Sequence, residues 1–143
     1  GPATAAALGV TLSASGSASA SSSTAIISSD HRLLSKLVYA EARGEPYKGM
    51  VAVAAVVLNR VRSSSFPNTI SGVIYQKGAF SCVSNGSINN TPNNQSIRAA
   101  LDALNGWDPT GGCLYYYNPR LTDDEWIRTR TVQTVIGNHY FAR

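Results

Sequence analysis

The sequence is poor in charge: its 143 residues include only 12 Lys and Arg and 8 Asp and Glu, with no basic run. The scattered net charge of +4 suits an anionic partner but forms no stripe of the kind that nucleic acid requires, so we expect no nucleic acid. No segment approaches the ~18 consecutive apolar residues of a membrane span. The longest apolar run, Met50 to Leu58, indicates a buried helix in a chain that does not span a membrane.

Cysteine and histidine are equally scarce. Cys82 and Cys113 could form one disulfide, as suits an exported protein, or could remain two free buried thiols, and the sequence leaves both open. These cysteines and the histidines, His31 and His139, lack the close spacing of a zinc site, so we expect no metal and no cofactor. A serine or cysteine hydrolase would need a histidine partner, and nothing marks His139 as one.

Composition divides the chain into two parts. Residues 1–29 are predicted to be a flexible linker rich in Ser and Ala, and residues 30–143 have a globular composition, long enough for one domain. The stretch from Gly1 to Gly9 resembles the closing segment of a small peptidoglycan-binding module. It could equally be a protease scar followed by linker. We expect a monomer.

Apolar periodicity and turn residues predict a helical N-terminal half and a small antiparallel sheet toward the C-terminus, an α+β arrangement. Asp30 and Thr69 are expected as helix N-caps. The expected elements are helices over 30–42, 48–63, 69–75 and 95–104, a long loop over 76–94, a strand over 113–117, and a hairpin of 129–136 and 139–142.

One carboxylate falls on the apolar stripe of the first predicted helix. Leu34, Leu37, Val38 and Glu41 follow the spacing i, i+3, i+4, i+7, so Glu41 shares the face that should be buried. Carboxylates are rarely buried without a partner or a function. The C-terminal helix end and the apolar neighbours both favour the neutral carboxylic acid, which is the form that a general acid needs.

The alternative is that Glu41 is a structural carboxylate paired with Arg43, Arg60 or Arg62, and the sequence gives both interpretations equal weight. Glu45 lies four residues after Glu41, in a predicted loop. It could be a second carboxylate or a substrate contact, but a structural or supporting role is favoured because acidic residues near a helix N-terminus are commonly structural.

An aromatic cluster follows later in the chain. In a strand, Tyr115 and Tyr117 point to one face and Tyr116 to the other, and Asn118 comes next. With Trp126, these tyrosines offer flat apolar faces with polar tips, which suit sugar rings. For Tyr116 we favour ordinary sheet packing. The remaining candidates for substrate binding or support are Gln76, Phe80, Ser81 and His139.

The stretch from Tyr39 to Val61 reads YAEARGEPYKGMVAVAAVVLNRV. It resembles the signature of the spore cortex-lytic enzyme and cell-wall hydrolase family. Later segments agree with it, and the resemblance extends over about residues 34–142. These segments are Phe80-Ser81, Tyr117-Asn118-Pro119, Trp126 and Ile136 to Phe141.

The resemblance implies a lysozyme-like α+β fold and a secreted enzyme that acts on peptidoglycan of the spore cortex or cell wall. By motif, the catalytic glutamate falls on Glu41. It would protonate the glycosidic oxygen between N-acetylmuramic acid and N-acetylglucosamine, then act as base while the muramic acid 6-hydroxyl attacks C1. This lytic transglycosylase reaction leaves a 1,6-anhydro end and needs no second carboxylate.

Other functions stay open. A hydrolytic glycosidase would use Glu45 or Asp123 to position water, and a wall-binding module would use the aromatic strand without catalysis. A cell-wall amidase would normally require a metal site. The family also implies a possible inhibitory or stabilising protein partner in the dormant spore.

Overall fold

The computed structural model describes residues 27–143. Most of the predicted linker and the whole possible module tail lie outside the described residues, so the division into linker and catalytic domain stays a prediction. The helical elements are α2 (Ser29–Ala42), α3 (Tyr47–Arg62), α4 (Ile70–Ile74), α5 (Ser81–Ser84), the 3₁₀ helix η3 (Ser87–Asn89), α6 (Asn94–Leu104) and α7 (Glu125–Arg128). The strands are β1 (Tyr115–Tyr117), β2 (Val132–Ile136) and β3 (His139–Ala142).

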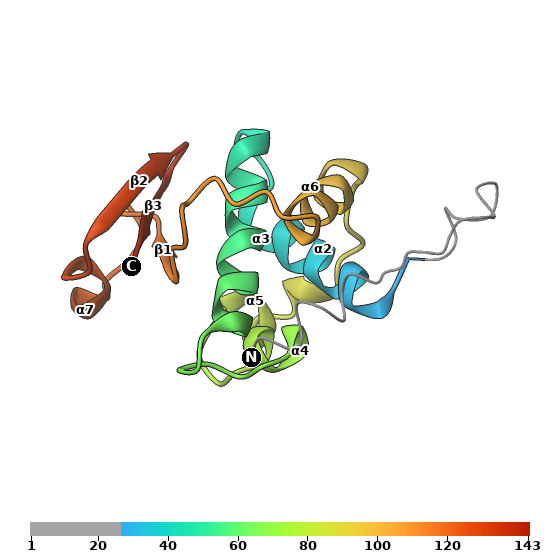
Figure 1. The fold of residues 1–143 in the computed structure, drawn as a ribbon, viewed down its shortest axis with the longest axis horizontal. Helices are drawn as coiled ribbons and strands as arrows, with labels where there is room; N and C mark the ends of the chain where they lie inside the picture. The colour runs from blue at the N-terminus through green and yellow to red at the C-terminus, as the bar shows by residue number, and fades with distance from the viewer. Residues whose placement is uncertain (1–26) are drawn as a thin grey trace.

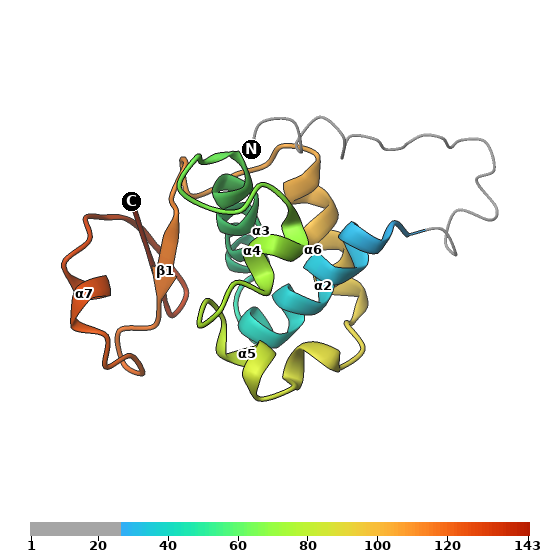
Figure 2. The same ribbon diagram turned by 90° about the horizontal axis from the view of Figure 1, so that it is seen from below.

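The predicted α+β arrangement is confirmed. Helix α3 stands between the other helices and the sheet, with α2 and α6 on one side and β1 on the other (Figure 1). Seen from below, the sheet and α7 form one side of the molecule and the helices form the other (Figure 2). Met50 to Leu58 are all buried, as the uninterrupted apolar run predicts.

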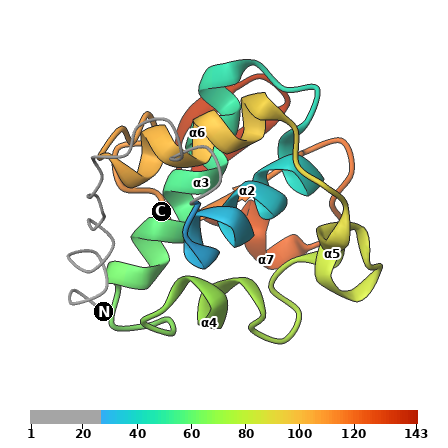
Figure 3. The ribbon, with the colours of Figure 1, turned by 90° about the vertical axis from the view of Figure 1, so that its right-hand side faces the viewer.

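Helix α2 packs against α3, α4 and α6, and Figure 3 shows it among these neighbours. Its apolar stripe is fully buried at Leu34, Leu37 and Val38, as expected. Phe141 of β3 is also fully buried and belongs to the same core, so one large aromatic side chain anchors the sheet to the helices.

The sheet has the order β1-β3-β2 and is antiparallel throughout. Ile136 pairs with His139 across the turn Gly137–Asn138, which confirms the predicted hairpin. The first hairpin strand begins at Val132 rather than at Thr129, because Thr129 instead ends α7.

Among the other differences from prediction are the cap of α2 and the start of β1. Ser28, not Asp30, caps α2, because the Ser28 hydroxyl accepts a hydrogen bond from the His31 backbone nitrogen at 3.0 Å. The strand β1 begins at Tyr115 rather than at Cys113, because the Cys113 backbone nitrogen donates to the Thr110 hydroxyl at 3.0 Å and closes a turn. Thr69 caps α4 as predicted.

The prediction of one long loop over residues 76–94 is wrong. The segment contains α5 and η3, each a single turn held by one buried apolar side chain, Cys82 in α5 and Ile88 in η3. Helix α7 was also not predicted, and Asp124 caps it by accepting from the backbone nitrogens of Trp126 and Ile127. Such short helices carry too few residues to show a periodic pattern.

Cys82 and Cys113 are both buried and both free, so of the two possibilities left open the structure has the free thiols. Within residues 27–143, no helix has the length and hydropathy that crossing a membrane would require.

Candidate active site

A cleft of about 520 Å³ opens between the helices and the sheet. Its walls come from the end of α2 and the loop after it, from α3, from the start of α5 and the segment before it, and from β1, the loop after β1, and β3. Seven of the ten predicted site residues line it: Glu41, Glu45, Phe80, Ser81, Tyr117, Asn118 and His139.

A second cavity of about 320 Å³ adjoins the cleft, and we call it the aromatic groove. It is lined by the three remaining predicted residues, Gln76, Tyr115 and Trp126. The two cavities share the residues Arg60, Ala79, Tyr116, Tyr117 and Thr122. The fold therefore gathers every predicted site residue into two adjoining hollows.

Glu41 is half-buried in the last turn of α2 and faces the cleft. The Tyr116 hydroxyl donates a hydrogen bond to Glu41 Oε1 at 2.6 Å. Burial, and secondarily Glu41 itself, raise the pKa of Tyr116 well above its ordinary value, so this hydroxyl stays protonated and stays a donor. Hydrogen bonds to a carboxylate are short and strong, so Tyr116 fixes the orientation of Glu41.

Tyr116 packs on Phe141 and His139 of β3, as the prediction of ordinary sheet packing expects, but the sequence did not reveal its hydrogen bond to Glu41. A signal was present in the alternation of β1, which places Tyr116 on the face opposite Tyr115 and Tyr117. That face packs toward the helices, and Glu41 lies on the face of α2 that packs toward it.

The alternative in which Glu41 pairs with an arginine is not supported, because all three candidate arginines have other partners. Arg43 donates to the Tyr39 hydroxyl at 3.2 Å, Arg60 donates to the Leu114 carbonyl at 2.7 Å, and Arg62 donates to the Asn59 side chain at 3.2 Å.

Both carboxylate oxygens of Glu45 are occupied by the hairpin turn. The backbone nitrogen of Asn138 donates to Glu45 Oε1, and the side-chain amide of Asn138 donates to Oε2, both at 3.0 Å. Glu45 thereby ties the loop after α2 to the turn between β2 and β3. This arrangement supports the structural role favoured from the sequence.

His139 is buried in the wall of the cleft, with its ring edge-on to Tyr116 at 5.0 Å between centroids. Burial lowers the pKa of His139, and the nearby carboxylates of Glu45 and Glu41 offset part of that shift. The imidazole is therefore neutral at neutral pH and supports the Tyr116 ring from the side.

The cell wall hydrolase family matches residues 44–142 of the sequence. This chain belongs to the cell wall hydrolase family. The match begins three residues after Glu41. The chain is 55% identical over 114 residues to the spore cortex-lytic enzyme of Bacillus cereus, covering 80% of this chain and 44% of the relative. It is 35% identical over 100 residues to the cell wall hydrolase CwlJ of Bacillus subtilis, covering 65% and 70% respectively.

Two solved structures share the fold of this member of the cell wall hydrolase family. The catalytic domain of Bacillus cereus SleB matches with a TM-score of 0.75 and 55% identity over 80% of this chain and 89% of that one. The catalytic domain of the germination-specific lytic transglycosylase SleB from Bacillus anthracis gives a TM-score of 0.78 and 52% identity over 82% and 97%. The chain spans less than half the length of the spore cortex-lytic enzyme from Bacillus cereus.

The turn that binds Glu45 should be sensitive to substitution of its glycine, Gly137. Gly137 has a φ of +60°, and a Cβ there would collide with Glu45 Oε1 and lie 2.8 Å from the Pro46 ring. We expect Gly137→Ala to lower the free energy of unfolding by about 2–5 kcal/mol, from the left-handed backbone and the collision together. Urea denaturation measures the change.

The matched control is Gly86→Ala, where φ is +86° but the added Cβ would meet open space. Its expected cost is about 1–2 kcal/mol from the backbone alone. Equal losses in the two variants would contradict the proposed collision with the loop after α2.

Cys82 lies beside Glu41 and is 2% exposed. Burial, followed by the charge and hydrogen bonding of Glu41, raises the pKa of Cys82 to about 12. The thiolate is the reactive form, so at about pH 8 we expect negligible alkylation of the native protein by iodoacetamide. Mass spectrometry should find both cysteines labelled only after unfolding, and rapid labelling of Cys82 in the native state would contradict this environment.

Proposed function

We propose that this domain cleaves the glycosidic bond between N-acetylmuramic acid and N-acetylglucosamine in spore cortex during germination, as a lytic transglycosylase with Glu41 as its single catalytic carboxylate. The observation that carries the proposal is the carboxylate of Glu41, half-buried in a cleft and oriented by Tyr116. The names of the relatives, a spore cortex-lytic enzyme and a germination-specific lytic transglycosylase, support the substrate and the reaction.

The hydrogen bond to Tyr116 divides the work between the two oxygens of Glu41. Oε1 accepts from Tyr116, and we assign Oε2 to carry the proton toward the substrate. Oε2 donates that proton to the glycosidic oxygen as the bond from C1 to this oxygen breaks. The resulting carboxylate then takes the proton of the muramic acid 6-hydroxyl, while the oxygen of that hydroxyl bonds to C1. The acid is regenerated, no water is consumed, and the product carries a 1,6-anhydro end.

The surroundings of Glu41 favour this reaction over hydrolysis. An ordinary glycosidase uses a second carboxylate as a nucleophile or to activate water. Both oxygens of Glu45 accept hydrogen bonds from Asn138, and Asp123 is exposed and outside the residues that line the cleft. Neither of the carboxylates considered for the hydrolytic alternative is thus placed as a free base beside Glu41.

The same proposal covers the setting of the enzyme. We place its action in the exported compartment of the cell wall and spore cortex, on glycan strands, with the domain working as a monomer. An inhibitory or stabilising protein partner in the dormant spore remains part of this hypothesis.

Mass spectrometry of digested spore cortex tests the reaction class. We expect muropeptides with 1,6-anhydromuramic acid ends, each lighter by one water than the reducing product. Reducing muramic acid or glucosamine ends would show a hydrolase, free stem peptides would show an amidase, and intact cortex would leave only wall binding.

A further inference from the structure

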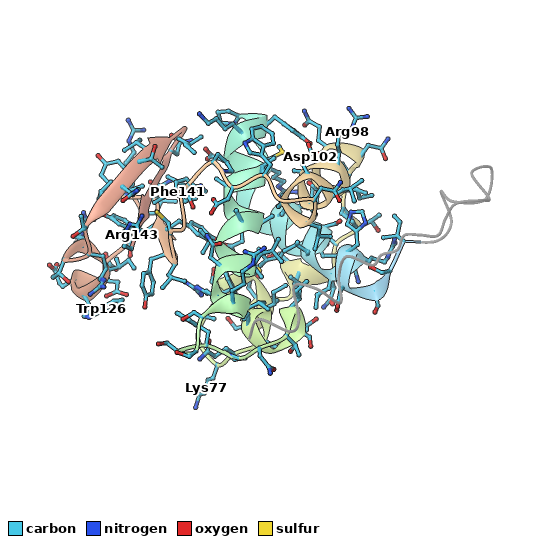
Figure 4. All side chains as sticks on the ribbon, viewed as in Figure 1. Lys77, Arg98, Asp102, Trp126, Phe141 and Arg143 are labelled. Atoms are coloured by element: carbon cyan, nitrogen blue, oxygen red, sulfur yellow. The ribbon has the colours of Figure 1, made fainter. Side chains whose placement is uncertain are left out.

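The aromatic groove continues the catalytic cleft away from Glu41, toward the sheet and α7. The shared wall contains Tyr116, which contacts Glu41, and Tyr117 beside it. Trp126 lies at the sheet end of the molecule, far from Arg98 and Asp102 of α6 at the other end (Figure 4). A polymer lying in the cleft could therefore pass directly into the groove.

The rings of the groove are held in place by a ladder of alternating cations and aromatic side chains. The Arg60 guanidinium lies over the rings of Phe80 and Tyr115, at 5.4 Å from each centroid. The Arg130 guanidinium lies over Tyr115 at 5.6 Å and over Trp126 at 5.1 Å. Tyr115 and Trp126 also meet edge-to-face at 5.3 Å. This ladder runs from Phe80 in the catalytic cleft to Trp126 in the groove.

Backbone contacts fix the position of Trp126 as well. Asp124 caps α7 through the backbone nitrogen of Trp126 itself, and one terminal nitrogen of Arg128 donates to the carbonyls of Pro119 and Thr122. Helix α7 and the preceding loop are thus fastened together. Trp126 nevertheless keeps 52% of its surface exposed, although this residue type usually buries most of its area. A rigid, exposed indole in a hollow binds a ligand with little loss of conformational entropy.

We propose that the aromatic groove is a distal glycan subsite, in which Trp126 stacks on an amino-sugar ring of the strand whose scissile bond lies at Glu41. This inference rests on the proposed function, because it takes peptidoglycan glycan as the substrate. A pyranose ring presents an apolar face of C–H groups, and an indole offers a flat apolar surface of matching shape. The subsite makes cleavage depend on strand length.

The sugar fits the groove better than a stem peptide does. Two cations at the groove are already engaged: Arg60 donates to the Leu114 carbonyl and Arg130 Nε donates to the Arg143 carbonyl, each while covering aromatic rings. The carboxylates of a stem peptide would have to compete with these contacts or reach the exposed Lys77, which also lines the groove. An uncharged ring needs only the exposed surface of Trp126.

The experiment compares Trp126→Ala with the unchanged enzyme on glycan strands stripped of their peptides and fractionated by length. In Trp126→Ala we expect the KM for long strands to rise about tenfold or more, with kcat within about twofold of the unchanged enzyme. The difference in KM between the two proteins should shrink as the strands shorten. Trp126→Phe keeps an aromatic surface and should restore most of the affinity. In a Glu41→Gln background, where no strand is cut, calorimetry should show the same loss of binding to long strands.

The matched control is Trp107→Ala. Trp107 is 44% exposed, and its backbone nitrogen bonds to the carbonyl of Asp102, at the end of the molecule away from the groove. This variant should bind long strands as the unchanged protein does. Equal KM values for Trp126→Ala and the unchanged enzyme would overturn the subsite, as would a loss confined to strands that carry stem peptides. Full activity of Glu41→Gln would instead overturn the proposed function, so the two failures are distinguishable.

Discussion

Glu41→Gln is expected to lower the rate of cortex lysis by about a thousandfold or more, because the amide can neither donate a proton to the glycosidic oxygen nor accept one from the 6-hydroxyl. Glutamine has the shape of glutamate, and its amide oxygen can still accept from Tyr116. The variant should therefore unfold at the same denaturant concentration as the unchanged protein. Loss of turbidity in suspensions of decoated spores measures the rate.

Glu125→Gln is the matched control for this prediction. Glu125 is the remaining glutamate outside the cleft region, exposed in the first turn of α7. Its replacement removes the same charge and should leave lysis within about twofold, since surface charge pairs contribute little. A normal rate for Glu41→Gln, or an equal loss in both variants, would mean that Glu41 is not the acid.

Tyr116→Phe is expected to lower kcat by about tenfold to a hundredfold while KM changes little. The 2.6 Å hydrogen bond joins Tyr116 to Glu41 Oε1, and bonds to charged groups contribute about 1.5–3 kcal/mol. Without it, Glu41 loses its fixed orientation. Initial rates of glycan cleavage at several substrate concentrations measure kcat and KM separately.

Tyr140→Phe provides the control. Tyr140 lies in the same sheet and packs on Tyr117, but it lines neither the cleft nor the aromatic groove. The variant should leave both kcat and KM unchanged. If Tyr116→Phe lowered only stability, with an unaltered kcat, the role of Tyr116 would be structural rather than positioning.

Elements that show a pattern over several consecutive residues could be predicted from the sequence. The apolar run from Met50 to Leu58 predicts the buried helix α3, and the turn Gly137–Asn138 between two β-rich segments predicts the hairpin. Glu41 stood out because three residues of its own helix define the buried face on which it lies. Each of these signals is local, so the sequence carries it without knowledge of the tertiary fold.

Contacts between residues far apart in the sequence could not be predicted in the same way. Tyr116 and Glu41 are 75 positions apart, and only the packing of β1 against the helices brings them together. The single turns α5 and α7 are set by one buried side chain or one capping residue, which no periodicity reveals. The state of Cys82 and Cys113 likewise depends on a separation that only the fold determines.

In the proposed reaction Glu41 serves as both acid and base, and no water enters. The most direct measurement is digestion of cortex in water labelled with heavy oxygen, followed by mass spectrometry of the new glycan ends. We expect 1,6-anhydro ends with no heavy oxygen, because the 6-hydroxyl supplies the attacking atom. New reducing ends that carry one heavy oxygen each would contradict it.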